Sequence, residues 1–128
     1  MKKNNTSLEV LYEDNHLIAI NKSSGDIVQA DKTGDQPLSE KVKNYLKLKY
    51  NKPGNVFLGT IHRIDRPTSG AVLFAKTSKA LSRMNEKFRE NTVEKTYIAI
   101  VKNKLPKIND IIENYLLKNQ KKNKSFIS

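Results

Sequence analysis

One carboxylate near the middle of the chain has neighbours that would suit acid–base or nucleophilic chemistry. Asp65 stands between Arg63 and Arg66, and a proline and a glycine follow it at Pro67 and Gly70. Two guanidinium groups close to a carboxylate favour its ionised form. The proline and glycine predict a turn, and loops on a rigid scaffold often carry functional side chains. An aspartate in a turn is also a common capping or surface residue, so the spacing alone leaves both interpretations open.

The full string around this carboxylate is more specific. Residues His62 to Gly70 read His-Arg-Ile-Asp-Arg-Pro-Thr-Ser-Gly. This resembles the His-Arg-Leu-Asp-x-x-Thr-Ser-Gly signature of RluA-type RNA pseudouridine synthases, with Ile64 where the family usually has leucine. The resemblance implies that Asp65 is the catalytic aspartate. It also implies that Arg63 holds RNA beside the position that the target base leaves.

The resemblance implies roles for the remaining residues of the motif. Thr68 and Ser69 are expected to contact substrate or RNA, and the residues expected to shape the loop are His62, Arg66 and Gly70. A second recurring family motif, Lys-x-Tyr, is matched by Lys95 and Tyr97. By the resemblance Tyr97 stacks on the uracil, a task for which an aromatic ring suffices. On strand statistics alone, Tyr97 would more often be a packing residue.

Composition limits the other possibilities. The 128 residues carry a net charge of +11 and no cysteine, which excludes disulfides and thiolate metal sites and is compatible with the cytoplasm. Twenty of the 24 basic residues follow position 35, against seven of the 13 acids. Such a basic surface favours RNA or DNA, although an abundance of Lys, Asn and Ile also indicates a compositional bias. No apolar run is long enough to cross a bilayer, so we expect no membrane partner, and residues 1–5 do not predict a signal peptide.

Hydrophobic periodicity predicts alternating strands and helices. Strands are expected at 8–12, 16–21, 71–75, 93–101 and 108–117, with a further start at 27–29. In the fourth of these, Ile98 and Ile100 are expected in the core. Helices are expected from Pro37 to about Lys49 and after a cap at Thr77 or Ser78, the second with Leu81, Met84 and Phe88 as its buried stripe. The basic residues of the second helix could contact phosphates, but a solvated face is the commoner explanation.

Together the pattern and the resemblance predict an α+β fold. We expect a mixed, mainly antiparallel sheet with flanking helices, covering 1–128 as part of one catalytic domain without an accessory RNA-binding domain. The family signature Asn-Lys-Pro-x-Gly is matched at 21–25, with Ser23 in place of proline. The family's later Gly-Arg-x-His-Gln-Ile-Arg segment has no match, which implies an incomplete fold. An incomplete sheet would leave an unpaired edge, so self-association through that edge is expected.

The resemblance implies an isomerase that converts a uridine in ribosomal or transfer RNA to pseudouridine, without a metal or organic cofactor. Two rival interpretations stay open at this point: a non-catalytic RNA-binding module, and a fragment that needs a second polypeptide. No phosphate-binding loop, dinucleotide motif or zinc-protease motif occurs, and His16 has no companion at metal-ligand spacing. A kinase would need a Gly-rich loop, and a glycosidase a second carboxylate near Asp65; neither is present.

Overall fold

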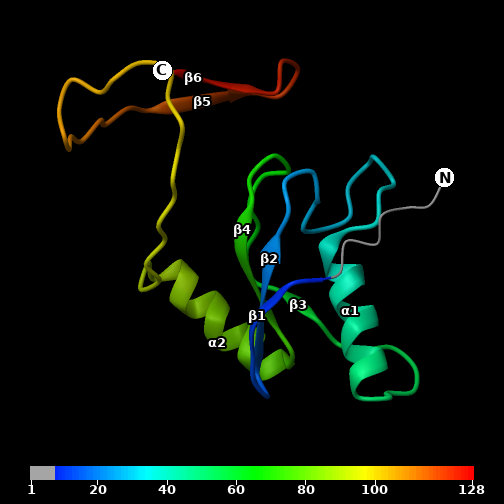
Figure 1. Cartoon of the computed structure of the whole chain (residues 1–128). Helices are drawn as coiled ribbons and strands as arrows, with labels where there is room; N and C mark the ends of the chain where they lie inside the picture. The colour runs from blue at the N-terminus through cyan, green and yellow to red at the C-terminus, as the bar shows by residue number, and fades with distance from the viewer. Residues whose placement is uncertain (1–7) are drawn as a thin grey trace. The chain divides into compact units, whose positions relative to one another are not determined.

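A computed structural model describes residues 8–128 of the chain (Figure 1). It divides into two compact units, residues 1–94 and residues 95–128. The N-terminal residues 1–5, on which the signal-peptide prediction rests, lie outside the described range. Each unit is described by itself.

The first unit is built on a four-stranded antiparallel sheet. Its strands are β1 (Val10–Glu13), β2 (Leu17–Lys22), β3 (Gly59–Thr60) and β4 (Gly70–Ala75). They lie in the order β1-β2-β4-β3, and each neighbouring pair is antiparallel. With one helix on each side, this arrangement confirms the predicted α+β class.

The core lies between this sheet and helix α1 (Leu38–Lys49). Alternate residues of β2 and β4 point to the same face, and register pairs Ile18 with Phe74 and Ile20 with Val72. All four side chains are fully buried. The helix supplies the matching apolar stripe, at the helical spacing that the sequence predicts: Leu38, Val42 and Leu46.

The start of α1 depends on residues that the sequence suggested as a strand. Ile27 and Val28 form no strand; they are buried, and their carbonyls accept hydrogen bonds from the backbone N–H of Leu38 (2.7 Å) and Ser39 (3.1 Å). Pro37, the N-cap residue, provides no side-chain cap. Since the first N–H groups of a helix have no partner within it, the two carbonyls replace the missing cap.

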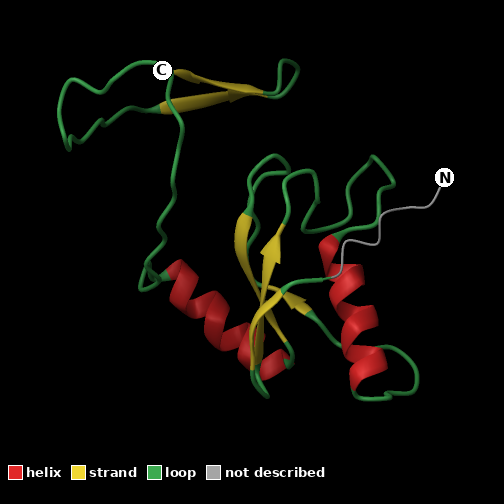
Figure 2. Cartoon of the chain, in the orientation of Figure 1, coloured by secondary structure: helices red, strands yellow, loops and turns green. Residues whose placement is uncertain are grey.

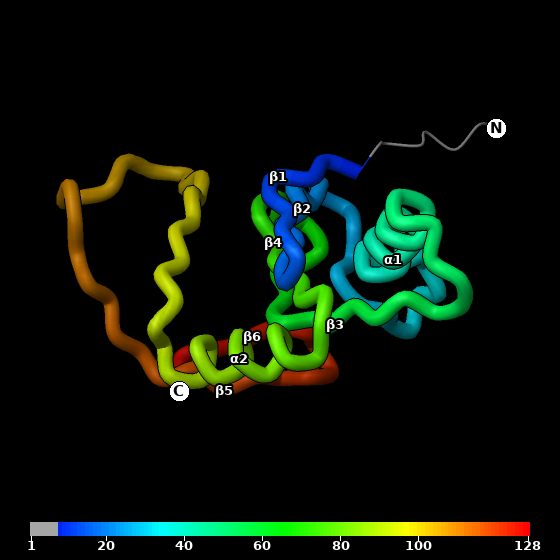
Figure 3. Tube along the Cα trace, turned by 90° about the horizontal axis from the view of Figure 1, so that it is seen from below, coloured from blue at the N-terminus to red at the C-terminus, as the bar shows by residue number. Residues whose placement is uncertain are grey.

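Helix α2 (Ser78–Arg89) covers the other side of the sheet, opposite α1 (Figures 1 and 3). Thr77 caps it as predicted, because its side-chain oxygen accepts a hydrogen bond from the Ala80 N–H at 3.1 Å. The helix approaches β3 closely at Gly59, where an added Cβ would lie 2.8 Å from a methyl of Leu81. A glycine at this point therefore lets α2 pack directly on the sheet.

The second unit holds one hairpin, formed by β5 (Leu116–Asn119) and β6 (Lys124–Ile127). The predicted strand at 93–101 is wrong, and the one at 108–117 overlaps β5 only at its end; the chain from 93 to 115 has no strand (Figure 2). Ile98 and Ile100 are 97% and 100% exposed, so they are not core residues. A strand needs a hydrogen-bonded neighbour, and none of the described residues pairs with this segment.

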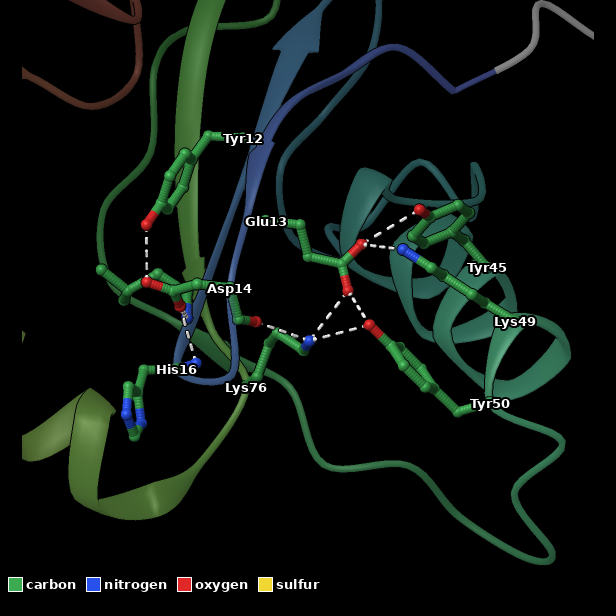
Figure 4. A network of polar contacts seen from close by, with 9 residues as sticks. Tyr12, Glu13, Asp14, His16, Tyr45, Lys49, Tyr50 and Lys76 are labelled. Atoms are coloured by element: carbon green, nitrogen blue, oxygen red, sulfur yellow. Dashed lines mark hydrogen bonds and ion pairs between the residues drawn. The ribbon is translucent and has the colours of Figure 1, made fainter.

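Through hydrogen bonds, Glu13 connects the C-terminal end of β1 to the C-terminal end of α1 (Figure 4). Its carboxylate accepts hydrogen bonds from Tyr45 (3.0 Å), Lys49 (2.9 Å), Lys76 (2.8 Å) and the Tyr50 hydroxyl. Burial alone raises the pKa of Glu13, but these four donors outweigh it and lower the pKa to about 2. The network therefore needs the ionised carboxylate.

The outer strand β1 leaves Leu11 and Tyr12 about half exposed. The Tyr12 hydroxyl donates to Asp14 at 2.7 Å, and this bond together with those from the backbone N–H groups of Leu17 and His16 lowers the pKa of Asp14 to about 2. Self-association through a sheet edge stays a prediction.

Replacing Glu13 with glutamine should destabilise the first unit in a pH-dependent way. Hydrogen bonds to a charged group contribute about 2 kcal/mol to the free energy of unfolding, so Glu13→Gln should lose about that much at neutral pH. Because the pKa is lowered on folding, the stabilisation is present above the unfolded value of 4.5 and is lost as the pH falls towards about 2. Urea unfolding of both proteins between pH 2 and 7 measures this. A difference that does not shrink in acid would contradict it.

Candidate active site

Asp65 lies in the connection between β3 and β4, on an exposed turn. The turn runs from Asp65 to Thr68 and is closed by a hydrogen bond from the Thr68 N–H to the Asp65 carbonyl at 2.9 Å. The Asp65 side chain is exposed, and within residues 8–128 its carboxylate forms no hydrogen bond or ion pair. Gly70, with φ of 135°, begins β4 in a conformation that favours glycine.

A buried lysine fastens this turn to the sheet. Lys22 is 0% exposed and continues the buried row of β2, opposite Gly70. Its ammonium donates to three carbonyls, those of Asp26 (2.7 Å), Ser23 (3.0 Å) and Arg66 (3.0 Å). Burial lowers the pKa of Lys22, whereas the negative charges of Asp26 and Asp65 act against that change. The lysine thus joins the turn after β2 to the turn that carries Asp65.

Arg66 strengthens the same junction instead of pairing with Asp65. Its carbonyl also accepts from the Gly25 N–H at 2.8 Å, and its side-chain Nε donates to the Gly25 carbonyl at 2.9 Å. The end of the guanidinium group binds Asp35, and this partner raises the pKa of Arg66. The expectation that two arginines flank the Asp65 carboxylate is therefore not met by Arg66. Its loop-shaping role stays a prediction, which these contacts support.

His62 links the Asp65 segment to both β4 and α2. Its Nε2 accepts a hydrogen bond from the Leu73 N–H at 3.0 Å, and its ring stacks on Phe88 with centroids 5.0 Å apart. To accept at Nε2, the imidazole must be neutral with its proton on Nδ1. The contacts support the predicted loop-shaping role of His62.

The other predicted site residues are divided between the two units of the chain. Arg63 and Ser69 are exposed beside Asp65 and Thr68 is half-buried, so the motif places all three on the same loop. Lys95 and Tyr97 belong to the second unit, where Tyr97 is 63% exposed. Their joint action with Asp65 stays a prediction.

Sequence reasoning missed two residues that build the site. Lys22 was noted only as part of a turn motif, yet its place in the alternation of β2, in phase with Ile18 and Ile20, was a readable signal of burial. Asp35 had no such signal, because it meets Arg66 from a loop 31 positions away. Among residues 8–128 no group of three or more His, Asp or Glu side chains is placed to hold a metal ion.

Comparison with known proteins decides the family. The sequence model described as RNA pseudouridylate synthase matches residues 16–128. The chain belongs to this family. Its match includes the whole motif from His62 to Gly70 and the Lys-x-Tyr pair.

Individual relatives are similar over most of the chain but are much longer. Ribosomal large subunit pseudouridine synthase C of Buchnera aphidicola subsp. Acyrthosiphon pisum is 42% identical over 115 residues, which are 90% of this chain and 35% of the relative. The proteins of the same name from Vibrio vulnificus and Escherichia coli O6:H1 are 39% and 37% identical, over 87% and 86% of this chain and 33% of each relative. The chain therefore spans about a third of the length of these relatives.

A solved structure supports the fold. Human RNA Pseudouridylate Synthase Domain Containing 4 superposes with a TM-score of 0.56 and 24% sequence identity, over 66% of this chain and 30% of that one. At this identity the likeness shows the fold alone. Within the described residues, no helix combines the length and apolar character needed to cross a membrane.

Removing the Lys22 ammonium should loosen the Asp65 turn. In Lys22→Met the side-chain length is kept but three carbonyl acceptors lose their donor, which should cost about 2 kcal/mol of unfolding free energy. The exposed helix residue Lys47 provides a matched control, because Lys47→Met removes the same charge from α1 with little expected effect. Urea midpoints of the three proteins test this. Equal midpoints for Lys22→Met and Lys47→Met would show that the junction does not stabilise the unit.

The hydrogen bond of His62 should be measurable on its own. His62→Phe retains an aromatic ring against Phe88 but removes the acceptor for the Leu73 N–H. One hydrogen bond contributes about 1 kcal/mol, which corresponds to a factor of about five in the opening equilibrium of this amide. Amide exchange by NMR should therefore show the Leu73 N–H exchanging about fivefold faster. The N–H of Phe74, the next residue of the same strand, serves as the internal reference. An unchanged Leu73 rate would rule out this bond.

Proposed function

We propose that this chain forms the aspartate-bearing part of an enzyme that converts a uridine of large-subunit ribosomal RNA to pseudouridine. The observation that carries the proposal is the placement of Asp65. Its carboxylate is exposed and unpaired among the described residues, while the backbone of the same turn is held by Lys22 and Arg66. A rigid loop that presents one available carboxylate suits a residue that must meet a substrate.

The reaction breaks the bond between uracil N1 and ribose C1′ and joins C1′ to uracil C5; C5 releases a proton and N1 takes one up, so that the product is an isomer of the substrate. A uridine in folded RNA must first leave its stack, at a cost of a few kcal/mol. Asp65, ionised, would act as a nucleophile or base at the ribose or the uracil ring. Arg63, exposed two residues earlier, would hold the RNA at the vacated position, with Thr68 and Ser69 beside it.

The tyrosine and lysine of the second unit complete the proposal. Tyr97 would stack on the detached uracil, and its large exposed surface leaves the ring available for that contact. Lys95 would contribute a positive charge to RNA binding. The names of the relatives, which specify the large ribosomal subunit, favour ribosomal over transfer RNA as the substrate.

A second candidate is a segment that acts only with further polypeptide. In the second unit, large apolar side chains such as Ile98, Ile100, Ile108 and Ile111 are 90% or more exposed. Soluble proteins rarely expose so much apolar surface without a partner. We therefore expect turnover to require the additional sequence that the longer relatives possess.

An activity assay on a graft tests both the role of Asp65 and the need for further polypeptide. Residues 8–128 would replace the matching third of the Buchnera relative, and release of tritium from RNA labelled at uracil C5 would be measured for the graft and for this chain alone. The graft should turn over, and its Asp65→Asn variant should bind RNA with similar affinity but lose turnover by at least ~10³-fold, the loss expected for a residue at the reacting atoms.

Glu40→Gln, which removes an exposed carboxylate from α1, is the control and should remain active. Turnover by the Asp65→Asn graft would refute the role of Asp65. Turnover by the 128-residue chain alone would show instead that no further polypeptide is needed.

A further inference from the structure

Helix α2 presents a line of basic side chains on its exposed face. Lys79, Arg83 and Lys87 recur every four residues, so they lie along one side of the helix, and all three are exposed. Arg89 adds a fourth cation in the last turn, and Glu86 is the one acid within the helix. The line from Lys79 to Lys87 is about 12 Å long.

Within the described part of the chain these cations have no ion-pair partner, in contrast to most of those on α1. On α1, Lys41 pairs with Asp26 (3.3 Å), Lys43 with Glu40 (3.4 Å) and Lys49 with Glu13 (2.9 Å). None of the ion pairs among residues 8–128 involves α2. Even Glu86, three positions after Arg83, forms no ion pair with any residue from 8 to 128. The charge of α2 is therefore available to an external anion, while most of the charge of α1 serves the fold.

The same helix is fastened to the segment that carries Asp65. Phe88 stacks on His62, three residues before Asp65, and Leu81 packs on Gly59 at the start of that segment. Lys87 and Arg89 adjoin Phe88 in the sequence. The C-terminal end of α2 is therefore the end that is held against the Asp65 segment, and RNA that brings a nucleotide to Asp65 would meet the line of cations from the Lys87 end.

We propose that the face of α2 formed by Lys79, Arg83 and Lys87 binds the phosphate backbone of the RNA next to the target nucleotide. The inference rests on the proposed function. Over about 12 Å a stacked strand carries roughly three or four phosphates, which matches the three cations. Contacts of this kind position the RNA without reading its sequence. The face would therefore contribute affinity and orientation, and the choice of uridine would be made elsewhere.

The test compares two triple variants with the same loss of charge. The first is K79Q/R83Q/K87Q on α2. The control is K32Q/K43Q/K47Q, which removes three cations from α1 and from the loop that precedes it. Binding to a fluorescently labelled hairpin of large-subunit ribosomal RNA would be measured by anisotropy in 50 to 200 mM KCl. Urea midpoints would establish that both variants remain folded.

Each lost phosphate contact lowers the slope of log K against log salt by about one. For the α2 variant the magnitude of that slope should therefore be smaller by about two to three, and binding at ~100 mM KCl should be at least ~10-fold weaker. The control should change the slope by less than about one. Equal effects of the two triples would overturn the inference, because only overall charge would then matter. If the unmodified chain alone does not bind the hairpin at low salt, the same two triples are compared in the graft described above. Equal binding of the two triples in the graft would overturn this inference, while turnover by the graft would leave the proposed function intact.

Discussion

The arrangement of the candidate site depends on one buried ammonium group. Lys22 lies at the end of the central strand, in line with two isoleucines of the core, and its three hydrogen bonds all go to backbone carbonyls. A buried cation is costly unless its donors are satisfied, and here the turns after β2 and before β4 supply the acceptors. Each of these two turns contains too few apolar residues to be held in place by packing. The position of Asp65 is therefore fixed by these polar contacts together with Ile64, which packs against the hydrophobic core one residue before it.

The sequence was sufficient for the features that depend on local patterns. Both helices begin within a residue of the predicted start, because the apolar spacing and the threonine cap are local signals, and the strands around Ile18 and Val72 follow from short apolar runs. The family motif located Asp65 on a turn for the same reason. Residues 27–29 show the limit of local signals. Ile27 and Val28, an apolar pair typical of a strand, form no strand, and their carbonyls accept hydrogen bonds from the first N–H groups of α1.

Features that depend on distant partners were beyond sequence reasoning. The alternating residues at 93–101 would form a strand only if another strand paired with them, and none of the described residues pairs with this segment. The partner of Arg66 could not be predicted either, since Asp35 is one of two acids in the polar loop 31–36. The same limit applies to charge. Composition showed a basic protein, but only the structure shows that α1 uses three of its lysines in ion pairs, whereas α2 forms none with the residues that the structure describes.

The Glu13 network has an asymmetry that bears on how the sequence can vary. Four donors from different parts of the chain meet a single acceptor (Figure 4), so the donors are redundant and the acceptor is not. Loss of one tyrosine or lysine leaves three donors on the carboxylate. Loss of the carboxylate leaves Lys49 and Lys76 close together without a counter-charge. Drift among natural variants should consequently be found at the donor positions, and a change at position 13 should be accompanied by the loss of at least one of the two lysines.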